Sequence, residues 1–347
     1  MNQRNSPAAP GQAARDAGFD ARYEAILAAC PEATFFHTRL WAAIVRGGFP
    51  GCEDRSEILA AGGREHALPL FRLRRLGGLL TGWHSGFPFL YGGPVPCGEA
   101  ALAAVRSSLA ARKGSVVLIG NPFAGGLDAG TAGPGGAACE GLALVPETTH
   151  LLALPADAET YWSEVLDTRK RNDIRRLARK GVRVETTREP ADIAAVHALY
   201  RARMASWRRK PGLVYPESFH RAMVSLGGQA VRCYVARYEG RVIGGAFVAR
   251  WNGIAHYNAG YFAEEARALR PNVLIQERII RDAIEDGFHL YDMLPSAGLP
   301  NVEAFKESFG GVRTRFPRWE RIAGLHRLAR ELRRLRGRLR ERPADEP

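Results

Sequence analysis

Alternating apolar and polar positions dominate the stretch from residue 231 to residue 261, a pattern typical of consecutive β-strands. Two alternating segments meet at Tyr238-Glu239-Gly240-Arg241, a polar turn with a glycine, which predicts a hairpin. A third strand is expected over residues 254–261, directly after Trp251-Asn252-Gly253. These three segments predict an antiparallel sheet.

The pattern changes to helical spacing in the next stretch of the chain. Apolar residues recur on roughly one face from about Asn272 to Asp286, and Gly287 is expected to end this helix. A short strand is then expected from Phe288 to Leu294. Three antiparallel strands, a helix and one further strand together predict a compact α/β core.

The remaining elements follow from the same two periodicities. In the first part of the chain we expect helices over residues 19–29, 39–46 and 99–112 and strands over 56–61, 65–73, 79–83 and 116–120. Around the core we expect strands over 149–154, 183–187 and 313–319, a basic helix or helix pair over 157–181, and helices over 191–207 and 216–226. The order of elements in the first half is thus close to the order in the second half.

Length and composition favour a globular protein of two domains. The 347 residues are 46% apolar and 24% charged, which suits a buried core but exceeds the usual size of one domain. The five cysteines are scattered without metal-ligand spacing, so no metal site is expected. No apolar run has the length of a membrane span and the N-terminus lacks the apolar core of a signal peptide, which predicts a cytoplasmic protein.

The formal net charge of +13 permits acidic partners, although an Arg-heavy composition is also typical of a GC-rich genome. Within the helix expected over 166–181, the stretch from Arg169 to Lys180 has seven basic residues against Asp173 alone, which would suit RNA phosphates or simply a solvated face. A second basic helix is expected over 321–342, with leucines every three or four residues. This helix would bind RNA, lie on the anionic inner surface of the membrane, or contact a partner protein. Alternatively, it would pack its leucines against the rest of the folded chain.

Four motifs of the second half carry a family resemblance. They are the basic helix over 166–182, the hairpin over 235–245, Arg270-Pro271-Asn272-Val273-Leu274 at the start of a helix, and Tyr291-Asp292 followed by Phe305-Lys306-Glu307-Ser308-Phe309-Gly310-Gly311. In these motifs the second half resembles the GNAT-like acyltransferase domain of the Fem-type (FemABX-like) proteins, which build peptidoglycan cross-bridges. In the first half, Phe35-Phe36-His37-Thr38, Trp41 and Tyr91-Gly92-Gly93-Pro94 are similar to the second copy that such proteins carry. The resemblance covers about residues 19–320.

The resemblance implies an α/β (α+β) fold of two tandem GNAT-like domains, each a mixed, mostly antiparallel twisted sheet flanked by helices. We expect a disordered N-terminus over 1–18, an N-terminal domain over 19–150 with a mobile Gly/Ala loop over 124–141, a C-terminal acyltransferase domain over 151–320, and a basic amphipathic helix and tail over 321–347.

The donor site implied by the resemblance lies at the start of the central helix. GNAT enzymes bind the phosphates of acyl-CoA there with the pattern [RQ]-x-x-G-x-[GA], whose glycines let backbone N–H groups approach. The corresponding residues here are Arg267-Ala268-Leu269-Arg270-Pro271-Asn272, followed by Val273. Both small residues are replaced and Pro271 lacks an N–H. An ordinary helix start remains the alternative, and the departure favours the aminoacyl-tRNA donors of the Fem branch over acetyl-CoA.

Acyl transfer to an amine needs a proton acceptor and a donor for the developing oxyanion. By resemblance, Lys306 is the candidate for stabilising the oxyanion or acyl group, with a helix-surface lysine as the alternative. Asp292 is expected to act as a base, to orient the acceptor, or to cap the end of a strand. Residues on the strand that lines the acyl cleft, or that match acceptor positions, complete the set: Tyr257, Asn258, Tyr261, Arg203, Trp207, His37 and Trp41. His256 lies on the opposite face from Tyr257 and is interpreted as a packed or solvent-facing histidine.

The sequence therefore predicts a cytoplasmic N-acyltransferase that transfers an acyl or aminoacyl group from acyl-CoA or aminoacyl-tRNA to an amine on a cell-envelope or polysaccharide-related acceptor. The alternative is a non-catalytic GNAT-like protein that binds a membrane or partner through its basic C-terminal helix.

Overall fold

The structure, a computed structural model, describes residues 18–75, 80–88, 90–110, 112–123, 141–206, 213–296 and 298–324. Three predictions fall outside this part of the chain: the disordered segment before residue 18, almost all of the mobile loop over 124–141, and Trp207. The basic helix expected over 321–342 also lies outside it, apart from its first four residues.

The N-terminal half contains most of the expected elements. They are α1 (Phe19–Ala28), η1 (Phe35–His37), α2 (Arg39–Gly48), β1 (Cys52–Asp54), β2 (Glu57–Ala61), β3 (Arg64–Leu68), β4 (Phe71–Arg75), β5 (Leu80–His84), α3 (Glu99–Ala110) and β6 (Ser115–Ile119). The single strand predicted over 65–73 is wrong, because the chain leaves β3 at Pro69, which has no N–H for a strand ladder. The strand β3 pairs with β2 and forms one bridge from Ala67 to Val95, whereas β4 pairs with β1 and β5 in the main sheet.

The C-terminal half confirms the predicted core. Its elements are β7 (Ala143–Ala153), α4 (Ala158–Thr160), η3 (Tyr161–Val165), α5 (Thr168–Ala178), β8 (Arg183–Thr187), α6 (Pro190–Ser206), α7 (Glu217–Gly227), η4 (Gly228–Ala230), β9 (Val231–Tyr238), β10 (Arg241–Trp251), β11 (Ile254–Phe262), η5 (Glu264–Leu269), α8 (Pro271–Glu285), β12 (Leu290–Asp292), α9 (Pro300–Glu307) and β13 (Val312–Arg321). Of the two forms predicted for the basic segment, the structure has a helix pair.

Two tight turns explain why β9, β10 and β11 form an antiparallel meander. Glu239 and Gly240 connect β9 to β10 with φ of 49° and 76°, and Asn252 and Gly253 connect β10 to β11 with φ of 51° and 70°. Two consecutive residues of positive φ match the right-handed twist of paired strands, and Asn-Gly is a preferred sequence for such a turn. Local sequence therefore fixes the register of the meander.

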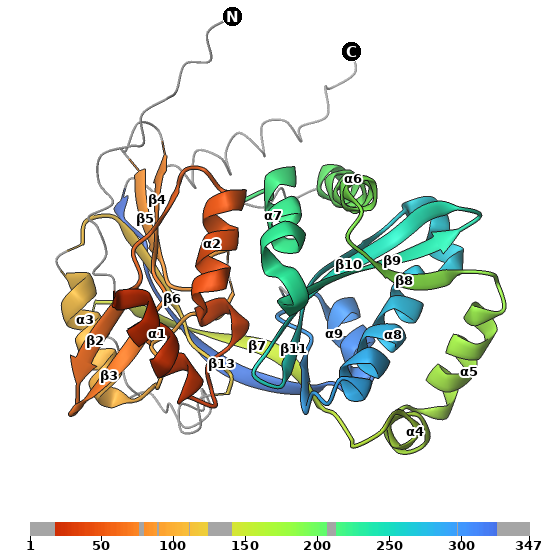
Figure 1. The fold of residues 1–347 in the computed structure, drawn as a ribbon, viewed down its shortest axis with the longest axis horizontal. Coiled ribbons are helices and arrows are strands. Elements are labelled where there is room, and N and C mark those ends of the chain that lie inside the picture. The colour runs from red at the N-terminus through yellow and green to blue at the C-terminus, as the bar shows by residue number, and fades with distance from the viewer. Residues whose placement is uncertain are drawn as a thin grey trace, which may run out of the picture.

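Eleven of the described strands form one sheet, which crosses the whole molecule in Figure 1 in the order β1-β4-β5-β6-β13-β7-β12-β11-β10-β9-β8. The pattern of parallel and antiparallel strand pairs is similar on the two sides of the central β13·β7 pair. The parallel pair β5·β6 corresponds to the parallel pair β11·β12, and each pair is flanked by an antiparallel neighbour on both sides. The helices α3 and α8 connect the parallel strands in the two halves. This order is that of two related α/β units placed edge to edge.

The two central strands are exchanged between the units. The strand β7 follows β6 along the chain but pairs with β12, and β13 follows β12 but pairs with β6 through Trp319 and its neighbours. The strands β7 and β13 also pair with each other from Val312–Leu151 to Glu320–Ala143. The boundary predicted at residues 150 and 151 falls inside β7, so the halves share strands.

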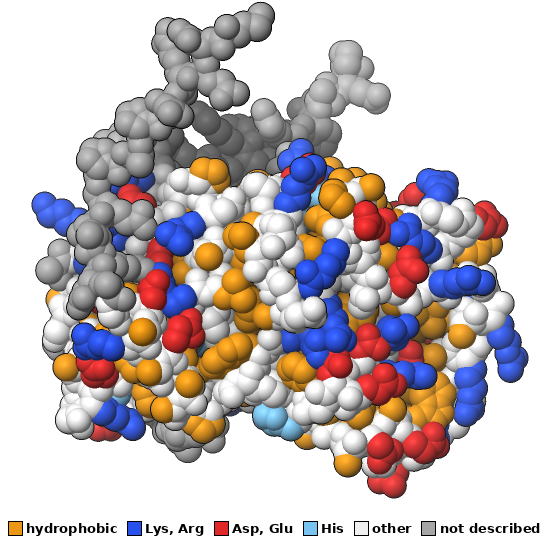
Figure 2. Space-filling model, in the orientation of Figure 1, with side chains coloured by type: hydrophobic (Ala, Val, Ile, Leu, Met, Phe, Trp, Pro, Cys, Tyr) orange, Lys and Arg blue, Asp and Glu red, His pale blue; other side chains and the backbone are white. Residues whose placement is uncertain are grey.

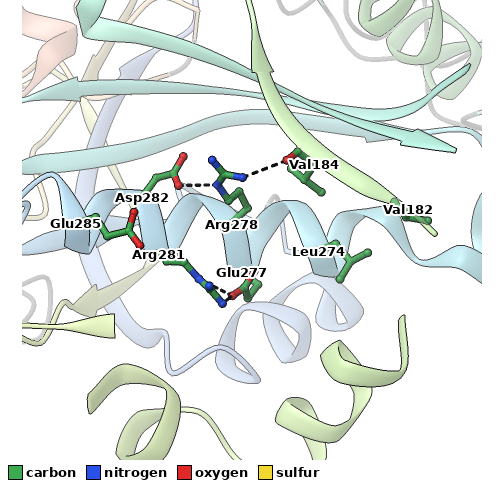
Figure 3. A pocket seen from close by; sticks show the side chains of 8 residues that line it. All are labelled: Val182, Val184, Leu274, Glu277, Arg278, Arg281, Asp282 and Glu285. Atoms are coloured by element: carbon green, nitrogen blue, oxygen red, sulfur yellow. Dashed lines mark hydrogen bonds and ion pairs between the residues drawn. The ribbon is translucent and has the colours of Figure 1, made fainter. Parts of the chain in front are cut away.

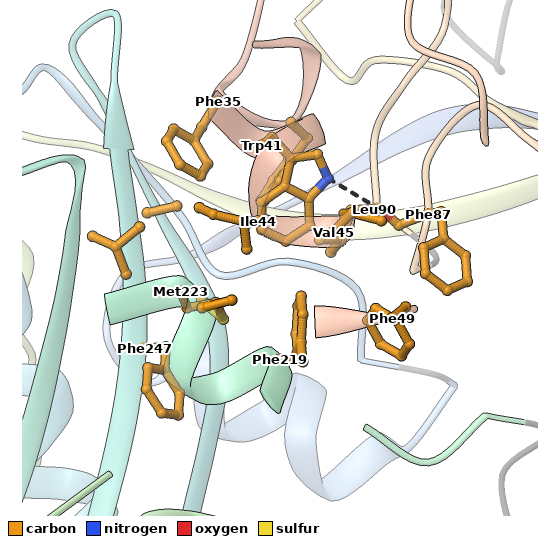
Figure 4. Close-up of a cluster of buried hydrophobic side chains, with 14 of the residues drawn as sticks. Phe35, Trp41, Ile44, Val45, Phe49, Phe87, Leu90, Phe219, Met223 and Phe247 are labelled. Carbon is orange, nitrogen blue, oxygen red and sulfur yellow. Dashed lines mark hydrogen bonds between the residues drawn. The ribbon is translucent and has the colours of Figure 1, made fainter. Parts of the chain in front are cut away.

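Helices cover both faces of the sheet. The helices α2, α6 and α7 lie on one face and α8 on the other, and α2 packs directly on α7 across the two halves in Figure 1. The aromatic cluster in Figure 4 fills this contact, with Trp41 of α2 edge-on to Phe219 of α7 at a centroid distance of 5.8 Å. Gly48 allows the approach, because a Cβ there would lie 2.6 Å from Cα of Phe219. The main core thus belongs to both halves.

A folded segment between β5 and α3 closes the parallel pair of the N-terminal half. The pairing of β5 with β6 ends at His84, and the chain then loops and returns to β6 where the N–H of Gly92 donates to O of Ile119 at 3.1 Å. A Cβ on Gly92 would lie 2.0 Å from O of Ser85, so only glycine fits. This packing fixes the backbone position of the neighbouring Tyr91.

Replacing Gly92 by alanine is expected to lower the free energy of unfolding by roughly 1–3 kcal/mol or more, because the new methyl group meets backbone that has no room to move. Urea denaturation followed by circular dichroism measures the change. Gly51→Ala is the matched control, since a Cβ there meets nothing within 4 Å. Equal stability of the two variants would contradict the proposed close packing.

Candidate active site

The strands β11 and β12 separate at one defined point in the C-terminal half. Their parallel pairing covers Ile254 to His256 against Leu290 to Asp292. Beyond this point β11 continues to Phe262 beside β10, while the chain leaves β12 and reaches Leu294 with a left-handed φ of 54°. A bulge at Asn258 adds to the divergence, because Phe247 opposes Ala259 while Val248 opposes Tyr257. The last paired residues, His256 and Asp292, therefore stand where the strands part.

Asp292 is a fully buried carboxylate with four hydrogen-bond donors. Its Oδ1 accepts from the hydroxyl of Thr149 at 2.8 Å, the backbone N–H of Leu294 at 3.0 Å and the hydroxyl of Tyr91 at 3.1 Å. Its Oδ2 lies 2.8 Å from Nδ1 of His256. These donors replace the water that burial removes from the carboxylate, so the cost of burying it is offset. Two of the four, Tyr91 and Thr149, come from outside the predicted C-terminal domain.

His256 is fully buried and points away from Tyr257, into the junction of the two halves. Its ring lies 4.8 Å from the ring of Phe36, 6.1 Å from Phe123 and 6.3 Å from Tyr91. Its Nε2 has no hydrogen-bond partner within the described residues. Of the two placements left open for this histidine, the structure has the packed one, in contact with a carboxylate.

Lys306 is a buried lysine near the same carboxylate. It lies in the last turn of α9 with 4% of its surface exposed, and its Nζ donates to O of Leu294. Burial lowers the pKa of Lys306 to about 8, an effect that the negative charges of Asp292 and Glu303 partly offset. The alternative of a helix-surface lysine is therefore wrong.

His37 and Trp41, predicted in the acceptor pocket, both lie on the face of the sheet that carries His256. The Nδ1 of His37 accepts from the backbone N–H of Thr34 at 3.1 Å, and burial lowers the pKa of His37 to about 4, so this ring is neutral. Trp41 is buried in the aromatic cluster and donates from Nε1 to O of Phe87 at 3.1 Å. His37 thus lies near enough to His256 for their charges to interact, while Trp41 is part of the hydrophobic core.

The three predicted cleft residues of β11 divide between the two faces of the sheet. Tyr261 packs on the face of α6, with its ring 5.0 Å from that of Tyr200. Tyr257 packs on the face of α8, and its hydroxyl occupies the space over Gly260. Burial raises the pKa of both phenols. Asn258 sits at the bulge between them, with its Nδ2 at 3.7 Å from Sδ of Met223.

The predicted donor loop forms the turn before α8. Arg270 is the left-handed residue before the helix, with φ of 46°, and Pro271 is the first residue of α8. The guanidinium of Arg270 binds Asp173 of α5, whereas Arg267 is exposed and pairs with Glu264 at 2.9 Å. Asn272 follows in the first turn, and Val273 is buried in the core with its N–H bonded to O of Arg270.

The basic helix α5 and the donor loop lie side by side. Besides the Arg270–Asp173 pair, Nζ of Lys180 donates to O of Ala268 at 2.8 Å. Burial, with the nearby charge of Arg270, lowers the pKa of Lys170. Cationic side chains of α5 spread along the edge of the molecule at the right of Figure 2. The two basic segments predicted separately therefore form one surface.

The remaining predicted residues and the surface hollows lie elsewhere. Arg203 is exposed in the last turn of α6. Two open hollows, of about 420 and 580 Å³, flank β8 and α8, and Figure 3 shows that charged residues of the first pair with one another, as in Arg278–Asp282 and Arg281–Glu277. Within the described ranges no group of three or more His, Cys, Asp or Glu could hold a metal ion. No helix among those residues is long and apolar enough to cross a membrane.

Sequence reasoning missed most of the cluster around Asp292. His256 was set aside, Tyr91 entered only through the resemblance, and Thr149 was not considered. Their side chains meet because β7, β11 and the segment after β5 converge on β12, a tertiary arrangement. One signal was available: the hydrophilic His256 and Asp292 lie within short runs, residues 254–257 and 290–294, that are otherwise apolar and aromatic.

Comparison with known families supports the predicted fold. A family model described as an acetyltransferase (GNAT) domain matches residues 167–307. No curated protein sequence matches the chain. The matched residues begin just before α5 and end with α9, so they include the donor loop, Asp292 and Lys306.

Solved structures of similar fold span almost the whole chain. FemX aligns with a TM-score of 0.63 at 12% identity, covering 90% of this chain and 98% of its own. A tandem GNAT protein from the clavulanic acid biosynthesis pathway aligns with 0.54 at 17% identity, covering 90% and 97%. The C-terminal domain of a putative lysylphosphatidylglycerol synthetase from Agrobacterium fabrum aligns with 0.53 at 15% identity, covering 89% and 95%. The predicted tandem GNAT-like fold is confirmed.

The stability of the chain is expected to rise with pH above about 8 through Lys306. The folded chain releases this proton near pH 8, while an unfolded lysine keeps it to about 10.5, so between these values the unfolded chain binds more protons. The free energy of unfolding of wild type minus that of Lys306→Met should therefore increase by roughly 1 kcal/mol per pH unit from pH 8 to 10. Urea titrations at pH 7.5, 8.5 and 9.5 measure it.

Lys180→Met is the control for this prediction. Lys180 is exposed and, like Lys306, donates from Nζ to a backbone carbonyl, so its removal should leave the pH dependence of stability unchanged. The buried-lysine assignment fails if Lys306→Met and Lys180→Met show the same pH dependence.

Proposed function

We propose that this protein, which has the FemABX-like tandem fold of the GNAT superfamily, is an N-acyltransferase. In this proposal it transfers an acyl or aminoacyl group from an activated donor to a primary amine on a cell-envelope or polysaccharide-related acceptor. The observation that carries the proposal is the separation of β11 from β12 at His256 and Asp292, with Lys306 buried beside it. An acyl group bound where the strands part would meet ionisable groups from several elements.

Lys306 is the proposed oxyanion stabiliser. With a pKa of about 8 it is mostly protonated at neutral pH, yet it is desolvated, so its charge acts at short range without competition from water. Its hydrogen bond to O of Leu294 fixes the ammonium at the end of β12. An acyl carbonyl placed there would gain a negative charge during attack by the amine, and the ammonium would offset it.

The proposed donor site is the surface formed by α5 and the turn before α8. It combines the start of a helix with the guanidinium of Arg270 and the ammonium groups of Lys170 and Lys180, which suits a phosphorylated donor. Both acyl-CoA and aminoacyl-tRNA present phosphates. The spread of cationic side chains along α5 favours the larger donor, aminoacyl-tRNA.

The proposed acceptor class draws on the names of structural neighbours. FemX and a domain of a putative lysylphosphatidylglycerol synthetase share this fold, and the second name refers to an amino-acid-modified lipid. Such a lipid is an envelope component, which supports an envelope-related acceptor. Residues on the α6 and α7 face, including Arg203, Tyr261 and His37, are proposed to contact it.

A donor panel is expected to reveal the activity. Thermal shift with acetyl-CoA, palmitoyl-CoA and alanyl-tRNA should show stabilisation by at least one donor, and consumption of that donor should require an amine such as Nα-acetyl-lysine. Lys306→Ala should lower kcat/KM about 10²–10³-fold, the usual effect of removing one oxyanion donor. No stabilisation and no turnover with any donor would favour a non-catalytic binding protein.

Asp173 and Arg270 are expected to have opposite effects on donor binding. Asp173→Asn removes the carboxylate that neutralises Arg270. The affinity for the active donor should therefore increase several-fold at low salt, measured as a lower Kd. Arg270→Ala should weaken it by a similar factor. Arg221→Ala, in an exposed ion pair with Glu217 on α7, is the control. Equal effects of Asp173→Asn and Arg270→Ala would show that the ion pair only supports the turn.

A further inference from the structure

We propose that His256 is the base that takes the proton of the attacking amine, and that Asp292 and Tyr91 are positioning residues that hold it in the reactive form. The inference rests on the proposed acyltransferase function and assigns a proton acceptor to it. It differs from the expectation that Asp292 itself is the base. The geometry around the carboxylate decides between the two residues.

Asp292 is held by donors on both of its oxygens. Its Oδ1 accepts from Thr149, Tyr91 and the N–H of Leu294, and its Oδ2 is bonded to His256, the imidazole in direct contact with the carboxylate. Burial, together with the charge of Asp292, raises the pKa of Tyr91, so its hydroxyl remains a donor. Loss of the negative charge on Asp292 would weaken all four of these hydrogen bonds inside a dry core, which disfavours it as the base.

The same contacts assign the tautomer of His256. An ionised carboxylate only accepts hydrogen bonds, so the proton of the imidazole lies on Nδ1, at 2.8 Å from Oδ2 of Asp292. The lone pair is then on Nε2, a fully buried atom without a partner in the described part of the chain. An unpaired buried acceptor costs about 1–3 kcal/mol, a cost that a bound amine N–H would remove.

The charges around His256 fit a base that becomes cationic during the reaction. Asp292 from β12 compensates the imidazolium directly. His37 from η1 stays neutral, because burial lowers its pKa to about 4, so it adds no competing charge near neutral pH. The phenol of Tyr91 is also uncharged, because burial and the charge of Asp292 raise its pKa. The ammonium of Lys306 interacts electrostatically with Asp292. Of these groups, the anion Asp292 contacts the ring directly, and the cation Lys306 interacts with that anion.

The position of His256 also separates the two substrates. His256 lies on the face of the sheet covered by α6, α7 and η1, whereas the donor loop begins α8 on the other face. An amine entering from the α6 and α7 side would reach the acyl carbon between the separated strands with its N–H toward Nε2. The imidazole is fully buried and the rings of Phe36, Phe123 and Tyr91 lie around it, so contact with the amine requires a neighbouring ring to turn aside.

The proposed step conserves atoms and electrons. The amine nitrogen attacks the acyl carbon, a C–N bond forms, and the C=O electron pair moves to the oxygen near Lys306. The amine proton passes to Nε2 of His256. Collapse of the tetrahedral intermediate restores C=O and breaks the bond from the acyl carbon to the sulfur or oxygen of the donor. The leaving atom then takes the proton from Nε2, and the imidazole returns to its starting form.

Two variants separate this role from a structural one. His256→Asn keeps an N–H for Asp292 but lacks the second nitrogen, so it should fold with nearly unchanged thermal stability and lose about 10²–10⁴-fold in kcat/KM for the active donor with Nα-acetyl-lysine. His66→Asn, at a buried histidine of β3 bonded to O of Pro96, is the control and should keep full activity.

A measurement on the ring itself needs no substrate. Nitrogen-15 NMR of histidine-labelled protein should show His256 as the Nδ1–H tautomer in wild type and in Tyr91→Phe, and as the Nε2–H tautomer in Asp292→Asn. An Nε2–H tautomer in wild type, or an active enzyme whose His256→Asn variant keeps its rate, overturns the assignment of His256 as the base. A wild type that consumes none of the three donors overturns the proposed function, and the base with it.

Discussion

The exchange of β7 and β13 is the constraint on which the rest of the structure depends. Each of these strands follows one unit along the chain and completes the sheet of the other, so neither unit has a full sheet alone. The shared aromatic core between α2 and α7 adds burial across the same line. Because backbone hydrogen bonds and apolar contacts both cross between the halves, their relative position is fixed with the accuracy that a reaction site demands.

That accuracy matters most at Asp292. A buried carboxylate is tolerated only when its donors are placed by rigid elements, and here they come from β7, β11 and the segment after β5. The N-terminal unit therefore contributes a donor to this carboxylate, since the segment that closes its parallel pair presents Tyr91. The two units share one architecture but differ at the ends of their parallel pairs.

Local sequence predicted the elements well and the site only in part. The turns at Glu239-Gly240 and Asn252-Gly253, the helix ended by Gly287 and the apolar stripe of α8 are encoded by neighbours in the chain, so they could be read directly. The strand break at Pro69, the burial of Lys306 and the hydrogen bond from Tyr91 to Asp292, 201 positions away, depend on tertiary packing. A lysine in the last turn of a short helix gives no sign in sequence of whether it faces solvent or the end of a strand.

The exchanged strands also bear on synthesis of the chain. The apolar strand β6, Ser115–Ile119, has its second neighbour in β13, which ends at Arg321, so some 200 residues (321 − 119) must follow β6 before its edge is covered. At roughly 5–20 residues per second, the ribosome leaves that edge open for about 10–40 s. An uncovered apolar edge is a template for pairing with other chains, so the nascent protein would depend on chaperones until its last strand emerges.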